Sequence, residues 1–208
     1  INSGDAVLIP AFGTTLETEA DLQSSGIDTD SEQFRQKYDT TCPFVSKVWK
    51  RGEELGREGY TIIIHGKFNH EETRATQSHT HQHAPTLVVF DRTEAEMVAD
   101  FIRGRLDEAT FAARFAARWS PGFDPQRDLE RVAVVNQTTM LAEETRQVSE
   151  VLRAAMRERY GPDQLEYRCA DTNDTLCYAT NQNLNATRAV LEAGAELAVI
   201  VGGYNSSN

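Results

Sequence analysis

The chain has 208 residues, of which 39% are hydrophobic and 25% are charged, a composition typical of a globular protein with one large domain or two small ones. Its formal net charge of −11 argues against a nucleic-acid-binding surface, although backbone N–H groups and hydroxyls still suit a small anion. Because no apolar run approaches the roughly 20 residues of a membrane span, the sequence predicts no membrane-spanning helix.

Short apolar runs alternate with helical patterns along the chain. In chain order they predict a strand at 6–10, a helix and a loop within 17–38, a helix at 44–58, a strand at 61–64 and a weaker strand at 87–90. An aromatic insertion at 103–130, expected to pack on the sheet, precedes a strand at 132–135, helices at 140–160 and 184–193, and a strand at 197–201. This alternation predicts an α/β fold with a mainly parallel sheet covered on both faces.

The three cysteines, an odd number and widely spaced, do not indicate a disulfide framework, which favours a reducing cytoplasm. Cys42 and Cys177 each lie in an Asp-Thr-x-Cys turn just before a predicted helix. A helix N-terminus favours the thiolate form, which is the ligand of iron–sulfur clusters. Taken alone, the turns leave open that both are small core residues, and Cys169, outside such a turn, fits that alternative better.

Polar side chains follow the predicted strands, at the sheet edge where parallel α/β folds place their ligands. His70 and Glu72 follow the 61–64 strand and are close enough to serve one site, as a hydrogen-bond donor and a proton donor; a solvated loop is the alternative. Gln137–Thr139 and Asn205–Asn208 follow two further strands. They suit a phosphate or diphosphate at a helix N-terminus, although such residues are also ordinary helix caps.

Five motifs stand in the order that is found in the LytB family, the 4-hydroxy-3-methylbut-2-enyl diphosphate reductases. They are Asp39–Pro43, His70–Glu72, Gln137–Thr139, Cys177–Thr180 and Asn205–Asn208. Any one of them is weak, but the five together resemble the family from the Ala11–Gly13 turn to the last residue. The resemblance implies three similar α/β lobes around a central cluster. Residues 1–42 would then be a remnant of the first lobe, 43–170 the central lobe with its insertion, and 171–208 the start of the third.

The resemblance also implies the residues of the site. Cys42 and Cys177 resemble two of the three ligands of a 4Fe-4S cluster, and Glu72 resembles the proton donor. The substrate-binding set, whose last three members would face the diphosphate, would comprise His70, Thr138, Ser206, Ser207 and Asn208.

The implied reaction is the reductive dehydroxylation of (E)-4-hydroxy-3-methylbut-2-enyl diphosphate, an allylic diphosphate. Glu72 would supply protons through Thr138, and two electrons would enter through the cluster from a carrier such as ferredoxin or flavodoxin. The products would be isopentenyl and dimethylallyl diphosphate of the non-mevalonate isoprenoid pathway.

Three features depart from the family pattern. The family's first cysteine has no counterpart, so this chain alone is expected to hold no complete cluster and to be inactive. Phe12 occupies the place of a family histidine in the Ala11–Gly13 turn. The stretches 23–38 and 103–130 are longer than in compact family members.

Two rival functions remain open at this point. One is a non-redox α/β module that binds a diphosphate, which predicts no iron. The other is a zinc hydrolase in which Glu72 acts as the base and the metal is held by Cys42 or by the alternating His79, His81 and His83. The polar surroundings of these histidines favour an exposed loop instead.

Overall fold

The structure, a computed structural model, describes residues 5–170, 172, 175, 177–199 and 201. At its centre is a three-stranded parallel sheet of order β2-β1-β3, formed by β1 (Thr61–His65), β2 (Thr86–Val89) and β3 (Val132–Asn136). In the register, Ile63 lies opposite Leu87 and Val134. The carboxyl ends of all three strands therefore meet at one edge, which positions the loops that follow them.

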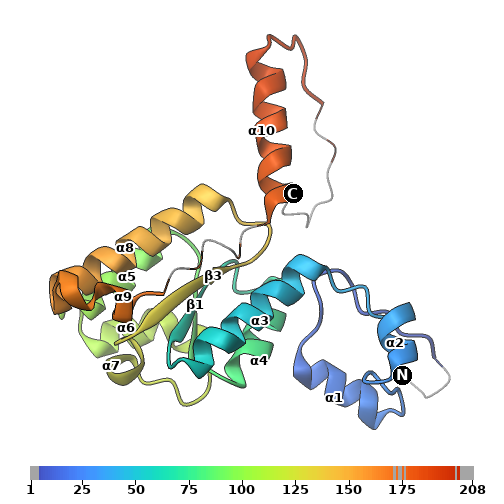
Figure 1. The fold of residues 1–208 in the computed structure, drawn as a ribbon, viewed down its shortest axis with the longest axis horizontal. Coiled ribbons are helices and arrows are strands. Elements are labelled where there is room, and N and C mark those ends of the chain that lie inside the picture. The colour runs from blue at the N-terminus through green and yellow to red at the C-terminus, as the bar shows by residue number, and fades with distance from the viewer. Residues whose placement is uncertain (1–4, 171, 173–174, 176, 200, 202–208) are drawn as a thin grey trace.

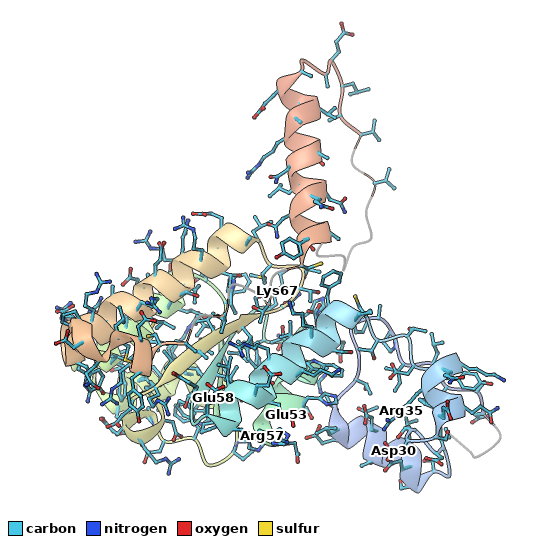
Figure 2. All side chains as sticks on the ribbon, in the orientation of Figure 1. Asp30, Arg35, Glu53, Arg57, Glu58 and Lys67 are labelled. Atoms are coloured by element: carbon cyan, nitrogen blue, oxygen red, sulfur yellow. The ribbon has the colours of Figure 1, made fainter. Side chains whose placement is uncertain are left out.

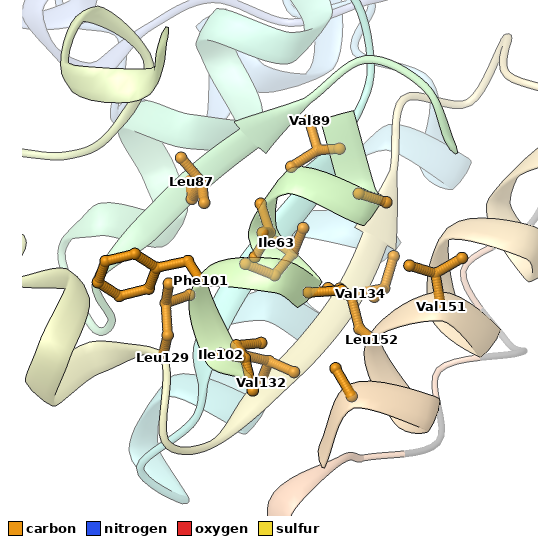
Figure 3. Packing of buried hydrophobic residues seen from close by; sticks show 14 of the residues in the cluster. Ile63, Leu87, Val89, Phe101, Ile102, Leu129, Val132, Val134, Val151 and Leu152 are labelled. Carbon is orange, nitrogen blue, oxygen red and sulfur yellow. The ribbon is translucent and has the colours of Figure 1, made fainter. Parts of the chain in front are cut away.

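Helices cover both faces of this sheet, as Figure 1 shows. Successive strand residues point to opposite faces, so Ile62 and Ile64 enter one hydrophobic core and Ile63 enters the other. The first face is covered by α3 (Pro43–Arg57) and α4 (Glu71–His81). The second face is covered by α5 (Arg92–Ile102), α6 (Glu108–Phe115) and α8 (Ala142–Tyr160). Figure 3 shows this larger core, in which Phe101, Ile102 and Leu152 pack on the strand residues.

The remaining elements are short or peripheral. They are α1 (Leu16–Ser24), α2 (Glu32–Lys37), η1 (Ala116–Arg118), α7 (Pro125–Asp128), η2 (Pro162–Gln164), α9 (Leu165–Arg168) and α10 (Tyr178–Glu192). Around α1 and α2 lies a small separate core formed by Ile9, Leu22, Ile27 and Phe34. In Figure 1, α10 projects away from the sheet. None of the helices in the described ranges is long and apolar enough to cross a bilayer.

The central sheet and its longest helices confirm the predicted α/β fold. The three strands match the predictions at 61–64, 87–90 and 132–135 to within one residue at each end. The helices predicted at 44–58 and 140–160 are also present as α3 and α8. All three strands are buried on both faces, which explains why their sequences are continuous apolar runs.

Two predicted strands are wrong. In the run 6–10, Ile9 forms an isolated bridge with Asp39, and Leu8 is 61% exposed. In the run 197–201, the described residues form no strand, and Leu197 and Val199 are 81% and 77% exposed. Both runs have the right composition. Around Ile9, backbone hydrogen bonds with Tyr38 and Thr40 form a single bridge that does not extend into a strand, and the described residues of 197–201 pair with no strand.

Two further predictions concern segments beside the sheet. The aromatic insertion packs on the sheet as predicted, since Phe111, Phe115 and Phe123 belong to the core that contains Ile63. The exposed loop predicted at the alternating histidines is wrong, because His79 and His81 lie in the last turn of α4. The buried positions of this helix are largely threonines, so its sequence shows no apolar periodicity.

Candidate functional site

The loops that follow β1 and β3 are joined by one buried glutamine. The Gln137 N–H donates to the carbonyl of His65 at 2.9 Å. The Gln137 Oε1 accepts hydrogen bonds from the Lys67 N–H and the Thr73 hydroxyl, both at 3.0 Å. A Cβ on Gly66 would lie only 2.7 Å from Thr73 Oγ1 and 2.9 Å from Gln137 Cβ, so a glycine is needed for this close approach.

Glu72 and Thr138 form a buried pair at this joint. Glu72 lies in the first turn of α4 and is 3% exposed, and Thr138 lies in the loop after β3. The Thr138 N–H donates to one carboxyl oxygen of Glu72, and its hydroxyl donates to the other at 2.9 Å. Burial raises the pKa of Glu72 above its ordinary value, and the two hydrogen bonds from Thr138 act in the opposite direction. The structure thus brings the predicted proton donor and the predicted relay into direct contact.

His70 begins α4 and lies beside this pair. Its Nδ1 accepts a hydrogen bond from the Glu72 N–H at 3.1 Å, so the neutral ring carries its proton on Nε2. Burial lowers the pKa of His70, and the positive charge of Lys67 lowers it further. Lys67 lies at the end of the molecule from which α10 emerges (Figure 2). The ring of Phe12 packs edge-on against His70, with centroids 6.0 Å apart.

Cys42 begins α3, as its turn predicts. It occupies the N-cap position, with Pro43 as the first helical residue, and it is a half-buried free thiol. Its N–H donates to the carbonyl of Ala11 at 2.8 Å, which ties the start of α3 to the Ala11–Gly13 turn. Phe12 of that turn contacts His70, so the start of α3 is linked to the Glu72–Thr138 pair through Ala11, Phe12 and His70.

Cys177 begins α10 and is connected to Thr138 by the first turn of that helix. The Thr180 hydroxyl donates to the carbonyl of Thr138 at 3.1 Å. The side chain of Asn181 accepts from the Ala142 N–H at 3.3 Å and donates to the carbonyl of Cys177 at 3.1 Å. Cys177 is a half-buried free thiol. The helix predicted at 184–193 therefore starts six residues earlier, at a turn with a structural link to the site.

The remaining predicted site residues either lie outside the described residues or are placed differently from the prediction. Ser206, Ser207 and Asn208 lie outside the described residues, so their prediction stays open. The expectation that Gln137–Thr139 open the long helix is wrong, because α8 begins at Ala142. Those polar groups instead bind side chains and loops of the site. Within the described ranges, no group of three or more His, Cys, Asp and Glu side chains is placed to hold a metal ion.

Cys169 lies at the opposite edge of the sheet. It forms a bridge with Val132, the first residue of β3, whereas the site follows Asn136, the last residue of that strand. It is 3% exposed, and burial raises the pKa of its thiol to about 11. These properties fit the predicted role as a core residue.

The sequence reasoning missed His65, the last residue of β1. It is fully buried, its Nδ1 lies 2.8 Å from the Thr145 hydroxyl of α8, and burial lowers its pKa to about 4. The sequence did contain an indication of this role, because a polar residue at the end of a buried apolar strand needs a hydrogen-bond partner. Asn136 at the end of β3 has the same property, and its side-chain carbonyl accepts from the Thr175 hydroxyl at 2.8 Å.

Comparison with known proteins identifies the family. The family described as "LytB protein" matches residues 1–208, the whole chain. This chain belongs to the LytB family. Among curated LytB relatives, the 4-hydroxy-3-methylbut-2-enyl diphosphate reductases of Synechococcus sp. (strain WH7803) and Thermosynechococcus vestitus are 43% and 42% identical over 208 residues. The chain spans about half the length of these relatives, 49% in both cases.

Solved structures of the LytB type share this fold. The structure titled "(E)-4-Hydroxy-3-methyl-but-2-enyl Diphosphate Reductase, the Terminal Enzyme of the Non-Mevalonate Pathway" superposes with a TM-score of 0.59 at 22% identity, covering 99% of this chain and 57% of that one. The Plasmodium falciparum reductase gives a TM-score of 0.56 at 18% identity, covering 88% and 43%. Both likenesses support the α/β architecture, while the three lobe boundaries stay a prediction.

Proposed function

We propose that this chain forms part of a 4-hydroxy-3-methylbut-2-enyl diphosphate reductase. The observation that carries the proposal is the buried Glu72–Thr138 pair, which contacts His70 and the first turn of α10. The family and the names of the relatives supply the reaction class. The substrate would be an allylic diphosphate, and the electrons would come from a carrier such as ferredoxin or flavodoxin in the cytoplasm.

The chemistry of the cysteines fits an iron–sulfur cluster. Cys42 and Cys177 are free, partly accessible thiols, and each lies at the start of a helix. They would provide two ligands of a 4Fe-4S cluster, and a further cysteine from outside this chain would complete the set. When bound, such a cluster supplies the electrons and a Lewis-acidic iron for the substrate hydroxyl.

Glu72 would supply the proton that allows the hydroxyl to leave. The reaction breaks one C–O bond and consumes two electrons and two protons; one proton completes a water molecule and the other forms a C–H bond. A raised pKa keeps the Glu72 carboxyl protonated to higher pH, as a general acid requires. With Glu72 protonated, the 2.9 Å contact would run from the carboxyl O–H to the Thr138 oxygen, so that Thr138 would take this proton and release its own hydroxyl proton toward the substrate.

His70 would orient the substrate. Its lowered pKa favours a neutral ring with the proton on Nε2, and a neutral N–H donor binds an oxygen of the substrate or its diphosphate. Ser206, Ser207 and Asn208 would supply further donors to the diphosphate, as the family pattern implies.

The proposal is tested by replacing Glu72→Gln in the whole protein, with its cluster intact. The amide keeps the shape of the side chain but has no proton to deliver, so kcat should fall by roughly 10²–10⁴-fold, the range for a lost general acid. Glu71→Gln is the matched control, because Glu71 is the adjacent, exposed residue and pairs with Arg74 at 3.4 Å. Turnover of the Glu72 variant at the wild-type rate would remove this carboxyl from the mechanism.

A further inference from the structure

The segment that carries Phe12 is held against α4 by a row of specific contacts. The carbonyl of Thr14 accepts a hydrogen bond from the His79 ring at 3.0 Å. The Leu16 N–H donates to the Ser78 hydroxyl at 3.0 Å, and that hydroxyl donates to Glu17 at 2.8 Å. Residues that are more than 60 positions apart in the chain are therefore joined over a single helical face.

At the centre of this row is a stacked pair of rings. Trp49 of α3 and His79 of α4 lie nearly parallel, with centroids 3.7 Å apart and an angle of 10° between their planes. The Trp49 Nε1–H donates to the Thr76 hydroxyl at 3.1 Å, which fixes the rotation of the indole. Both partners of the stack are thus held in one orientation.

Gly13 fits against the edge of this stack. It has a φ of +75°, and a Cβ at this position would lie 2.4 Å from Cη2 of Trp49. The turn must therefore come into contact with the indole at this residue. Because Gly13 follows Phe12, the position of the stack determines where the Phe12 ring meets His70.

The protonation state of His79 suits this role. Since the Thr14 carbonyl only accepts, the His79 Nε2 must carry a proton. Burial lowers the pKa of His79, which favours the neutral ring that lies flat on Trp49. The alternating histidines are thus explained in part without a metal ion: His79 is a packing and hydrogen-bonding residue.

We propose that the stacked pair Trp49–His79 positions the Ala11–Gly13 turn, and through it both the Phe12 ring on His70 and the backbone of Cys42. The contact to Cys42 is direct, because its N–H donates to the Ala11 carbonyl at 2.8 Å. The catalytic part of this inference rests on the proposed reductase function. The positioning of Cys42 does not, and it is measured separately.

The test compares two substitutions of His79 in the whole protein. His79→Gln removes the stacked ring, and His79→Phe keeps a ring on Trp49 but loses the bond to Thr14. His83→Gln is the control, because His83 lies just beyond α4 and faces Glu53 at 3.6 Å rather than the turn. Circular dichroism and thermal unfolding first establish that each variant is folded.

The first readout is the labelling rate of Cys42 by a thiol reagent in the cluster-free protein, followed by peptide mass spectrometry with Cys177 as internal reference. His79→Gln should label Cys42 several-fold faster relative to Cys177, His79→Phe should lie between it and wild type, and His83→Gln should match wild type. An unchanged ratio in a folded His79→Gln variant overturns the proposal.

The second readout is kcat/KM of the cluster-loaded protein. We expect a loss of about tenfold or more in His79→Gln, with partial recovery in His79→Phe, because small displacements of reacting groups are costly. Faster labelling of Cys42 with undiminished kcat/KM would overturn the claim that the stacked pair Trp49–His79 positions the site. A wild-type protein without reductase activity would refute the proposed function, while the labelling result would still decide the positioning of Cys42.

Discussion

At the scale of single residues, the site depends on what surrounds each ionisable group. Glu72 and Glu71 are neighbours in the chain, but only Glu72 turns inward to meet Thr138. Burial disfavours its charged form, so its pKa rises, while the exposed Glu71 pairs with Arg74. The pKa of His70 is lowered instead, because burial of a base favours its neutral form. A raised pKa of an acid and a lowered pKa of a histidine both favour the states that the proposed reaction would use, a protonated carboxyl and a neutral ring.

The raised pKa of Glu72 makes folding stability depend on pH. A carboxyl whose folded pKa exceeds its unfolded value contributes stability that is fully present below the unfolded pKa, near 4.5, and is lost as pH rises through the folded pKa. In Glu72→Gln this loss should be absent. The free energy of unfolding of this variant, relative to wild type, should therefore increase as the pH is raised from 4.5 toward neutrality.

Urea titrations at several pH values measure this difference, with Glu71→Gln as the control. A pH-independent difference between Glu72→Gln and wild type would show that the Glu72 carboxyl titrates as an ordinary exposed group.

At the scale of elements, the insertion at 103–130 binds a buried carboxylate on α5, the helix that follows β2. Glu94 of α5 has a side chain that is 4% exposed and accepts from Arg114 at 2.5 Å, from Arg118 at 2.6 Å and from the Phe90 N–H at 2.7 Å. Three segments of the chain thus meet at one side chain.

Glu94→Ala should lower the free energy of unfolding by about 2 kcal/mol, because it removes a buried carboxylate that accepts charge-assisted hydrogen bonds from Arg114 and Arg118, whose side chains are 48% and 23% exposed. Glu96→Ala is the control: its side chain is 43% exposed, and a surface pair contributes at most about 1 kcal/mol. Equal stability of the two variants in urea unfolding would contradict the proposed role of Glu94.

The elements that could be predicted from the sequence are those that pack against neighbouring elements of the described fold. β1 and β3 are apolar on both faces because each is covered by helices, so composition alone identifies them. The run 197–201 has the same composition but no strand partner among the described residues. The helix α4 was missed where threonines replace apolar residues at its buried face, and the Trp49–His79 stack was missed because nothing in the local sequence links α3 to α4.

At the scale of the whole molecule, the proposed site draws on four segments of the chain. The loop after β1 provides His70 and Glu72, the loop after β3 provides Thr138, and the helix starts at α3 and α10 provide the two cysteines. The motif order predicts that these residues serve one site, and of its members the structure brings Glu72, Thr138 and His70 into contact. The contacts among them, such as Thr180 with Thr138, were not predictable from spacing.

The most direct test of the account is the iron content of the whole protein, purified without oxygen, together with its absorption in the iron–sulfur region. Wild type should hold about four irons per chain, Cys42→Ser and Cys177→Ser should lose most of them, and Cys169→Ser should match wild type, because Cys169 lies at the opposite edge of the sheet. If wild type binds no iron, or if the Cys42 and Cys177 variants retain it, the two cysteines are not cluster ligands, and a non-redox diphosphate-binding module becomes the better account.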